Sequence, residues 1–254
     1  MPKLNQKVAI VTGATGGIGR ATATSFVREG ARVMLVDRDE AALRALSTEL
    51  GPNTHYAVAD VCRVEDNQRY VRATVERFGG LDILFANAGI EGTVAPITEL
   101  PVDAFDRVLA VNVRGVFLGM KFAIPEIAKR GGGSIIATSS VAGLVGSPSL
   151  SAYVTSKHAL IGLARSAALE LAATRIRVNT VHPGPIDNRM MRGIEDQLAP
   201  GKGEEVRTGF EQQVPMGRYG TNQEIANLAL FLASDDASYC TGSVFVADGG
   251  FTAH

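Results

Sequence analysis

Short apolar segments alternate with longer amphipathic segments along almost the whole chain. The apolar residues of each short segment are mostly consecutive, which is typical of strands that are buried on both faces of a parallel sheet. The longer segments, such as residues 20–30 and 225–235, show the period of a helix. The pattern predicts seven strands, at residues 7–12, 32–37, 55–60, 82–87, 134–139, 177–182 and 243–248.

This alternation predicts an α/β fold of the Rossmann type, a doubly wound seven-stranded parallel sheet with helices on both faces. Gly30, Gly51 and Gly79 are expected to end three of the helices. No linker or repeat divides the chain, so residues 1–254 are expected to form one domain. Residues 188–220 are rich in Met, Gly, Pro and charge and interrupt the alternation. We predict a substrate loop or lid there.

Composition and charge narrow the function classes. With 25 Lys and Arg against 26 Asp and Glu, the chain offers no electrostatic reason to bind nucleic acid or an acidic membrane. No signal-peptide core and no apolar run of membrane-spanning length is expected, so we predict a cytoplasmic protein. Cys62 and Cys240 are expected to be reduced thiols, and no His, Cys and Asp spacing suggests a metal site.

A glycine-rich turn, "TGATGGIG" at residues 12–19, follows the first predicted strand. Gly13, Gly17 and Gly19 would permit a tight turn and let backbone N–H groups approach a pyrophosphate at the start of the next helix. Glycines also serve simple packing of a strand against a helix. The position of this turn in the first strand–helix unit favours dinucleotide binding.

Asp37 ends the second predicted strand, eighteen residues after Gly19. A carboxylate there would accept hydrogen bonds from the adenosine ribose and repel a 2′-phosphate, which favours NAD over NADP. Arg38 leaves NADP open, because a guanidinium beside the ribose pairs with such a phosphate. Asp37 would otherwise cap the following helix, but Asp39 is better placed for that cap, which leaves Asp37 free.

Tyr153 and Lys157 lie four residues apart in "AYVTSK", so on a helix they share one face. They form either a surface pair or a proton-transfer device. A free tyrosine has a pKa near 10, too high for a base at neutral pH. An ammonium group and an oxidised nicotinamide would both favour the phenolate, so we predict a lowered pKa for Tyr153.

Four motifs together resemble the short-chain dehydrogenase/reductase family. They are "TGATGGIG", "ANAG" (86–89), "AYVTSK" (152–157) and "HPGPID" (182–187), and the resemblance runs from Lys7 to "TGSVFVADGG" near the end. It implies a nicotinamide-dependent enzyme that interconverts a secondary alcohol and a ketone by hydride transfer, and it implies a homotetramer.

The resemblance also implies catalytic roles. Tyr153 matches the acid/base, and Lys157 matches the lysine that lowers its pKa and holds the nicotinamide ribose. Ser140 matches the serine that orients the substrate oxygen, because it lies thirteen residues before Tyr153, whereas Ser139 is one residue off. Asn112 matches the asparagine of a proton relay. From their types alone, Asn112 could be an ordinary helix residue and Ser140 a loop serine.

Further residues match cofactor contacts of the family. Asn188 stands where the family often has threonine, which changes the geometry of one contact. His158 and His182 are expected to be structural. The implied cofactor set is Gly13, Thr15, Gly17, Ile18, Gly19, Asp37, Arg38, Asp60, Val61, Asn87, Ala88, Gly89, Tyr153, Lys157, Pro183, Gly184, Ile186 and Asn188.

The predicted substrate pocket is mainly apolar and shows no arginine pair placed for a carboxylate or phosphate. That favours an uncharged hydrophobic or aromatic alcohol or ketone, and the methionines suit broad specificity. An NADP(H)-dependent 3-oxoacyl-[acyl-carrier-protein] reductase and a non-catalytic nucleotide sensor on the same fold are the alternatives. The predicted pocket residues are Leu144, Val145, Met190, Met191 and Ile194.

Overall fold

Seven parallel strands form a single sheet in the order β3-β2-β1-β4-β5-β6-β7 in the computed structural model, which describes residues 2–253. All seven predicted strands are present, and the predicted fold class is confirmed. Their bounds are β1 Val8–Thr12, β2 Arg32–Asp37, β3 Thr54–Val58, β4 Ile83–Ala86, β5 Gly133–Thr138, β6 Ile176–Pro183 and β7 Val244–Ala247.

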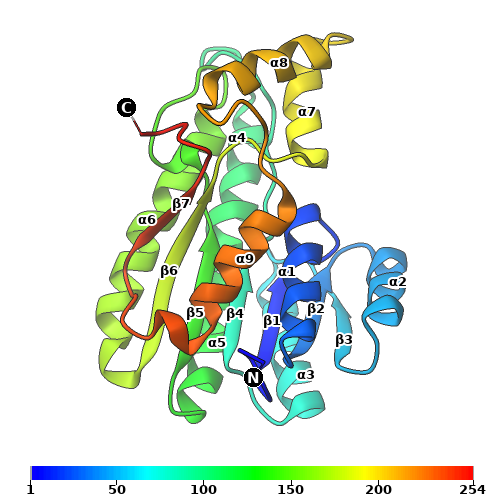
Figure 1. The fold of residues 1–254 in the computed structure, drawn as a ribbon, viewed down its shortest axis with the longest axis vertical. Helices are drawn as coiled ribbons and strands as arrows, with labels where there is room; N and C mark the ends of the chain where they lie inside the picture. The colour runs from blue at the N-terminus through cyan, green and yellow to red at the C-terminus, as the bar shows by residue number, and fades with distance from the viewer. Residues whose placement is uncertain (1, 254) are drawn as a thin grey trace.

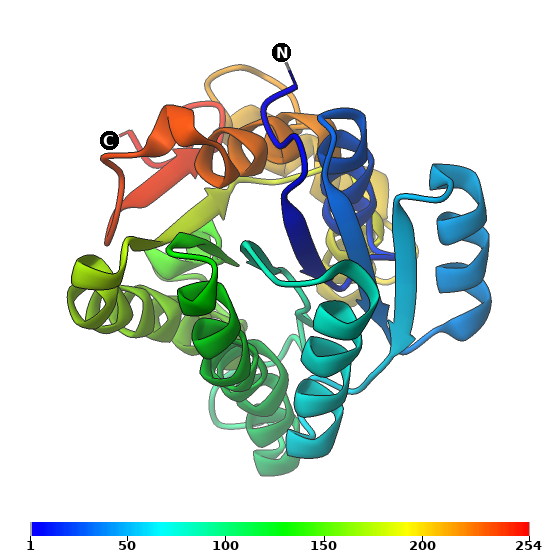
Figure 2. The same ribbon diagram turned by 90° about the horizontal axis from the view of Figure 1, so that it is seen from below.

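Helices cover both faces of the sheet (Figures 1 and 2). Helices α1 and α9 pack against each other on one face, and α3 packs against α5 on the other. The helices are α1 Gly17–Arg28, α2 Glu40–Leu50, α3 Val64–Phe78, α4 Val102–Leu109, α5 Gly115–Lys129, α6 Ser151–Leu171, α7 Arg189–Leu198, α8 Gly203–Gln213 and α9 Asn222–Ala233.

The consecutive apolar residues of the strands are explained by this two-sided burial. On β1, Val8 and Ile10 join the core beneath α3, α5 and α6, whereas Ala9 and Val11 join the core beneath α1, α2 and α9. Successive side chains of a strand point to opposite faces, so a strand covered on both sides needs apolar residues at every position.

The predicted helix ends are found at all three glycines. Gly51 and Gly79 are the residues that follow α2 and α3, with φ of 82° and 83°. Gly30 has φ of 88° and comes one residue after the end cap of α1. Positive φ costs glycine little, so it stops a helix with a sharp change of direction.

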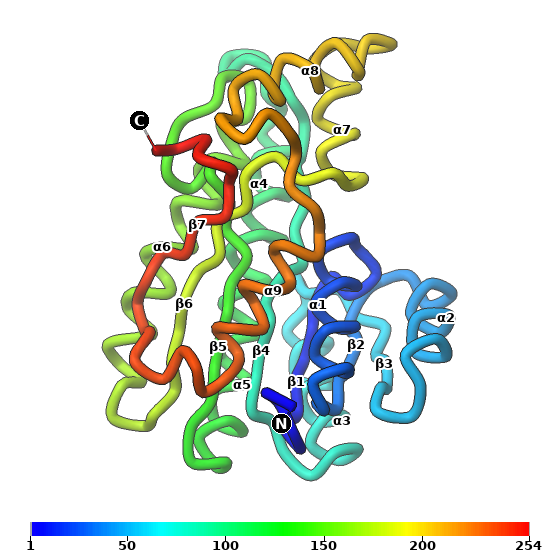
Figure 3. Tube along the Cα trace, viewed as in Figure 1, coloured from blue at the N-terminus to red at the C-terminus, as the bar shows by residue number. Residues whose placement is uncertain are grey.

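The order of the strands places a switch point between β1 and β4. The chain leaves β3 at one edge and crosses to β4, on the other side of β1. Ligands of open α/β sheets bind beyond the carboxyl ends of the strands at such a point. Figure 3 shows α7 and α8 beyond the carboxyl ends of the strands.

The segment 188–220 differs from the predicted loop, because most of it is helical in α7 and α8. The Asn188 side chain caps α7 by accepting a hydrogen bond from the Met191 N–H at 3.1 Å. In α8, Arg207 and Glu211 form an ion pair one turn apart, at 2.9 Å. The residue types that suggested a loop instead supply a cap and helical ion pairs.

A continuous helical stretch runs from Val102 to Lys129, through α4, the π-helical turn η1 (Ala110–Arg114) and α5. By length and composition it could cross a membrane, but Arg114, Lys121 and Glu126 interrupt its apolar residues, so it holds no apolar run of that length. Its apolar face belongs to the core, through Val116, Met120, Ala123 and Ile127. A buried core helix of a globular protein has the same composition.

Candidate active site

Tyr153 and Lys157 share one face near the start of α6, as predicted. Both are buried, at 9% and 3% exposure, and the Lys157 Nζ lies 5.3 Å from the centre of the Tyr153 ring. Nζ also donates a hydrogen bond to the carbonyl oxygen of Thr138 at 2.8 Å. A surface pair is therefore excluded, since the lysine is held inside the protein between α6 and β5.

The protein by itself raises the pKa of Tyr153, whereas the predicted lowering relied on Lys157 and an oxidised nicotinamide together. Burial raises it to about 12; the neighbouring Ser140 hydroxyl favours the phenolate, and the charge of Glu91 disfavours it. Burial also lowers the pKa of Lys157 to about 8. Both shifts favour the neutral forms, because a buried charge loses its hydration. The surrounding protein thus keeps Tyr153 as a neutral phenol.

Asn112 lies in the π-helical turn η1 and is almost fully buried. Its side chain brackets Ile90, donating to the Ile90 carbonyl and accepting from the Ile90 N–H, both at 2.9 Å, and it donates to Ser156 Oγ at 3.0 Å. A methyl group on Gly89 would lie 3.3 Å from Asn112 Oδ1 and 3.5 Å from Lys157 Nζ. Asn112 is therefore no ordinary helix residue, since it joins the segment after β4 to α6 beside Gly89 and Lys157.

The two candidate serines have different surroundings. Ser139 Oγ donates to the backbone carbonyl of Lys157 at 2.8 Å and is buried in that contact. Ser140 Oγ accepts from the Ala142 N–H at 3.1 Å and adjoins the Tyr153 hydroxyl. This arrangement favours Ser140 for substrate contact, as the spacing predicted.

The histidines and cysteines lie outside the chemistry. His182 is fully buried, with Nδ1 donating to the Ser140 carbonyl and Nε2 accepting from Thr180 Oγ1, each at 2.8 Å. His158 is exposed. Cys62 and Cys240 are free thiols, and within residues 2–253 no group of three His, Cys, Asp or Glu could hold a metal ion.

The glycine-rich turn is packed without space for a side chain at two of its positions. Gly13 has φ of 64°, and a methyl group on Gly19 would lie 2.1 Å from the Gly13 carbonyl oxygen. Helix α1 then begins at Gly17 with no side-chain cap on its first N–H groups. Thr15 and Ile18 are half-buried at the same turn. A turn of this kind presents N–H groups to an anion.

Asp37 is held by the glycine-rich turn. Its Oδ2 accepts from the Thr15 N–H at 3.0 Å and from Thr15 Oγ1 at 2.6 Å, and its Oδ1 accepts from the Arg38 N–H at 2.7 Å. Asp39 caps α2 as predicted, through the Ala42 N–H. Asp37 is thus free of the helix cap, as predicted, although Thr15 and Arg38 use three of its roughly four acceptor positions.

A wide basin of about 440 Å³ opens beside Asp37, at the carboxyl end of β3. Asp60, which is predicted to lie beside the adenine, lines it, and so does Arg38. Two more arginines that the sequence analysis missed, Arg63 and Arg69, line it as well. Arg69 pairs with Asp66 at 2.7 Å, whereas Arg38 and Arg63 form no ion pair within residues 2–253. No motif in the sequence marks these arginines.

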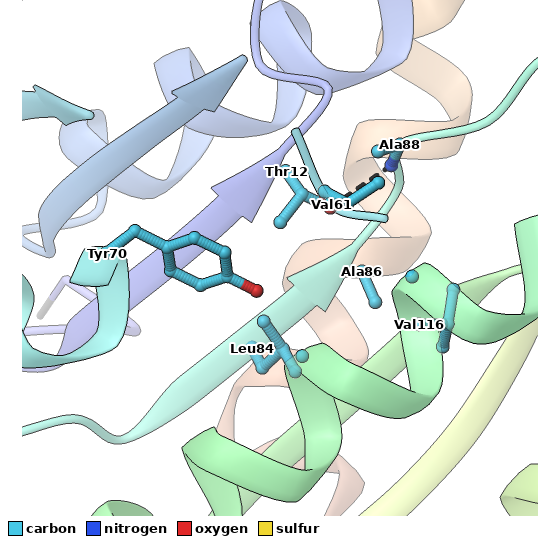
Figure 4. A pocket seen from close by; sticks show the side chains of 9 residues that line it. Thr12, Val61, Tyr70, Leu84, Ala86, Ala88 and Val116 are labelled. Carbon is cyan, nitrogen blue, oxygen red and sulfur yellow. Dashed lines mark hydrogen bonds between the residues drawn. The ribbon is translucent and has the colours of Figure 1, made fainter. Parts of the chain in front are cut away.

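The segment after β4 is tied to the neighbouring strands. Thr12 Oγ1 accepts from the N–H groups of Asn87 and Ala88, at 3.0 and 3.1 Å, and the Asn87 amide donates to the carbonyls of Thr12 and Gly13. Figure 4 shows Thr12 and Ala88 beside a closed cavity that Val61 also lines. Its volume of about 10 Å³ is roughly that of one water probe, so it is a packing void.

Ile186 presents an unpaired stretch of backbone. Gly220 donates to the Pro185 carbonyl and accepts from the Asp187 N–H, both at 2.9 Å, in a parallel bridge opposite Ile186. Within residues 2–253, the N–H and C=O of Ile186 itself have no partner, which suits the predicted contact with a carboxamide. Pro183 and Gly184 precede it at the end of β6, and Gly184 packs against Asp248. The side-chain carbonyl oxygen of Asn188 accepts the hydrogen bond that caps α7.

The apolar side of the site is built on Tyr153. It clusters with Ala142 and Leu150, and Met190 packs against them with its sulfur 3.9 Å from the Tyr153 hydroxyl. Of the predicted pocket residues, Met190 is thus the one that the described structure places against Tyr153. Val145 is 41% exposed and Ile194 is buried in α7, while Leu144 and Met191 are half-buried.

Comparisons with known proteins agree with this geometry. A family model described as enoyl-(acyl carrier protein) reductase matches residues 13–252. The chain is 39% identical over 253 residues to cyclohexanol dehydrogenase of Acinetobacter sp. (strain SE19), covering 98% of this chain and 96% of that relative. The crystal structure of levodione reductase matches it with a TM-score of 0.96 at 38% identity, over 98% of this chain and 99% of the other. The chain belongs to the short-chain dehydrogenase/reductase family.

Another short-chain relative, 2,5-dichloro-2,5-cyclohexadiene-1,4-diol dehydrogenase of Sphingobium indicum, is 40% identical over 258 residues and covers both chains completely. These relatives make the chain an enzyme, an alcohol dehydrogenase or ketone reductase that uses a nicotinamide cofactor. The non-catalytic sensor is thereby excluded.

Sequence reasoning missed two residues that join the two sides of the site. Asn222, at the start of α9, donates to the Asp187 carbonyl at 3.3 Å and would touch a methyl group on Gly17. Asn222 lies inside the capping box of Thr221 and Glu224, and the sequence "TNQE" indicates the start of a helix there. Glu91 belongs to the segment after β4 and lies against Gly193 of α7, and no pattern in the sequence marks it.

Proposed function

We propose that the protein is an NAD(H)-dependent oxidoreductase that interconverts an uncharged cyclic secondary alcohol and its ketone, with Tyr153 as acid/base. The observation that carries the proposal is the buried group of Tyr153, Lys157, Ser140 and Asn112 beside the glycine-rich turn. The named substrates of its relatives, a cyclohexanol and a chlorinated cyclohexadienediol, support a ring alcohol.

The residues present fit a dinucleotide. The turn at Gly13 and Gly19 leaves no room for side chains, the first N–H groups of α1 lack a side-chain cap, and the backbone of Ile186 is unpaired. These groups would hold the pyrophosphate and the carboxamide, and Lys157 would hold the adjoining ribose. Bound nicotinamide would supply the hydride acceptor in oxidation, with a positive charge near the phenol, and the hydride donor in reduction.

Residues of the chain itself transfer the proton to and from the substrate oxygen. Tyr153, kept neutral by burial, gives its proton to the carbonyl oxygen when a ketone is reduced, and its phenolate takes the hydroxyl proton when an alcohol is oxidised. Ser140 orients the substrate oxygen beside the phenol. Asn112, held by Ile90 and Ser156, positions the backbone between β4 and Lys157. Because oxidation needs the phenolate and reduction needs the phenol, we expect oxidation to rise with pH and reduction to fall.

NAD is the proposed cofactor because Asp37 keeps a carboxylate at the end of β2. Thr15 and the Arg38 N–H use three of its roughly four acceptor positions, so one on Oδ1 remains for a ribose hydroxyl, and its charge opposes a 2′-phosphate. Arg38 and Arg63 favour the alternative, an NADP(H)-dependent 3-oxoacyl-[acyl-carrier-protein] reductase, because they could pair with that phosphate.

A homotetramer in the cytoplasm is the proposed form. Large apolar side chains are exposed on α5, α6 and β7, namely Phe117, Leu169 and Val246, at 46%, 84% and 43%. Exposed apolar groups on neighbouring elements are typical of surfaces that bury against another subunit. The measurement is the mass in solution by light scattering.

The test follows absorbance at 340 nm with cyclohexanone and a 3-oxoacyl thioester, offered with NADH or NADPH. We expect NADH-dependent reduction of the ring ketone, and a loss of about 10²–10⁴-fold in kcat for Tyr153→Phe. The Asp37→Asn variant should gain activity with NADPH, because it keeps the shape and loses the charge. A wild-type enzyme that prefers NADPH and the thioester would replace this proposal with the alternative.

A further inference from the structure

Glu91, in the segment after β4, lies against the face of α7 that carries Met190, the residue in contact with Tyr153. A methyl group on Gly193 would lie 2.7 Å from Glu91 Oε1, so the carboxylate rests against the backbone of α7 there. Met190, whose sulfur is 3.9 Å from the Tyr153 hydroxyl, is one turn earlier. Residues three apart on a helix lie side by side, about 5–6 Å between their Cβ atoms. The carboxylate and the phenol are therefore neighbours along one face of α7.

The backbone that carries Glu91 is fixed from both sides. Asn112 binds the N–H and the C=O of Ile90 at 2.9 Å. Beyond Glu91, Gln197 of α7 accepts from the Val94 N–H at 3.1 Å and donates to the Gly92 carbonyl at 3.4 Å. Neither anchor depends on the Glu91 side chain, so its placement is determined by the catalytic asparagine on one side and by α7 on the other.

The carboxylate itself has nothing to bind within the described chain. It is half-buried and forms no hydrogen bond or ion pair with residues 2–253, whereas its neighbours Asp187 and Glu195 are both paired with Arg192. Its charge reaches the phenol, because it raises the pKa of Tyr153. A hydroxyl group on a substrate at the reacting centre would supply a donor to this carboxylate.

We propose that Glu91 is a specificity-determining residue, which binds a second hydroxyl group of a cyclic alcohol and excludes substrates that carry a carboxylate. This assignment rests on the proposed function. It adds a negative charge to one wall of the mainly apolar pocket that was expected from Met190 and its neighbours. The chemical class it selects is the ring diol or hydroxyketone over the simple ring alcohol.

The test compares wild type with Glu91→Gln, and uses Glu99→Gln, an exposed acid of the same segment, as matched control. The readouts are kcat/KM for cyclohexanol, for cyclohexane-1,2-diol and cyclohexane-1,4-diol, and for reduction of 4-oxocyclohexanecarboxylate against cyclohexanone. Removing a like charge close to the substrate should raise kcat/KM for the carboxylate about tenfold or more. Each value is divided by that of the same variant on cyclohexanol or cyclohexanone, which cancels any effect of the charge on Tyr153, and the preference for a diol over cyclohexanol should fall about tenfold.

A gain on the charged ketone cannot come from a damaged fold, so it would support the assignment directly. Unchanged ratios for both the diols and the charged ketone in Glu91→Gln, with normal activity on cyclohexanol, would overturn the role of Glu91 and leave the proposed function standing. A wild-type enzyme that binds NADH but turns over none of these ring compounds would overturn both.

Discussion

The two sides of the candidate site are held by different forces. On the cofactor side, Gly13 and Gly19 are in backbone-to-backbone contact, with no room for one further carbon. On the substrate side, α7 and α8 are held by partly exposed charges, as in the pairs of Asp187 with Arg192 at 2.8 Å and with Arg207 at 3.1 Å. Close packing tolerates almost no change, whereas exposed ion pairs can be lost at little cost. The cofactor turn is therefore constrained and the substrate segment adaptable.

The largest loss of stability should come from adding one methyl group on the cofactor side, compared with the same change on the substrate side. Gly19→Ala would place its Cβ 2.1 Å from the Gly13 carbonyl oxygen, a rigid backbone atom, and we expect a loss of about 1–3 kcal/mol in the free energy of unfolding. Weaker binding of NADH should accompany it. Urea titration and NADH fluorescence measure the two effects.

Gly193→Ala is the matched control on the substrate side. Its Cβ would meet the end of the flexible Glu91 side chain, and alanine is favoured over glycine inside a helix by about 1 kcal/mol. We expect unchanged or slightly greater stability. Equal losses in the two variants would mean that the cofactor turn is no more tightly constrained than α7.

An intermediate effect is expected at His182, which is buried like the glycine-rich turn but bonded through its side chain. Burial lowers its pKa to about 4, whereas an unfolded histidine titrates near 6.5. Between these values the unfolded chain binds more protons, so stability should fall as pH falls from 6.5 to 4. His182→Gln should flatten that part of the curve, as measured by urea titration at each pH. An identical slope in the variant would contradict the assignment.

The smallest effect should come from the ion pairs of α8. Arg207 pairs with Asp187 and Glu211 and stacks 4.8 Å from the centre of the Tyr219 ring. Arg207→Gln should cost roughly 1 kcal/mol, and less at high salt. Arg44→Gln, which loses one exposed pair with Glu40, is the control and should cost about 0.3–0.5 kcal/mol. A salt-independent loss at Arg207 would point to packing instead of charge.

The same contrast explains what the sequence could predict. Glycines at 13 and 19 and the spacing of Tyr153 and Lys157 are local features, and the structure places them as expected. The burial pattern of the strands is local too. The helices of 188–220 were missed because their charges and glycines are typical of loops until their partners are known.

The direction of the Tyr153 pKa could not be predicted either, since it depends on burial and on Glu91, which only the fold brings near. Asp37 shows the same limit within a well-predicted motif. Its distance along the chain from Gly19 was informative, but its bonds to Thr15 require the turn to be folded.

The parallel bridge between Ile186 and Gly220 has a consequence for how this protein could change over evolution. The hydrogen bonds of Gly220 with Pro185 and Asp187 join the two ends of the segment that carries α7 and α8. A segment whose two ends are bonded to each other can be replaced as a unit, because the positions of its ends relative to the sheet do not depend on the residues between them. New substrates could thus be acquired by replacing about thirty residues, while the hydride chemistry below them is inherited intact.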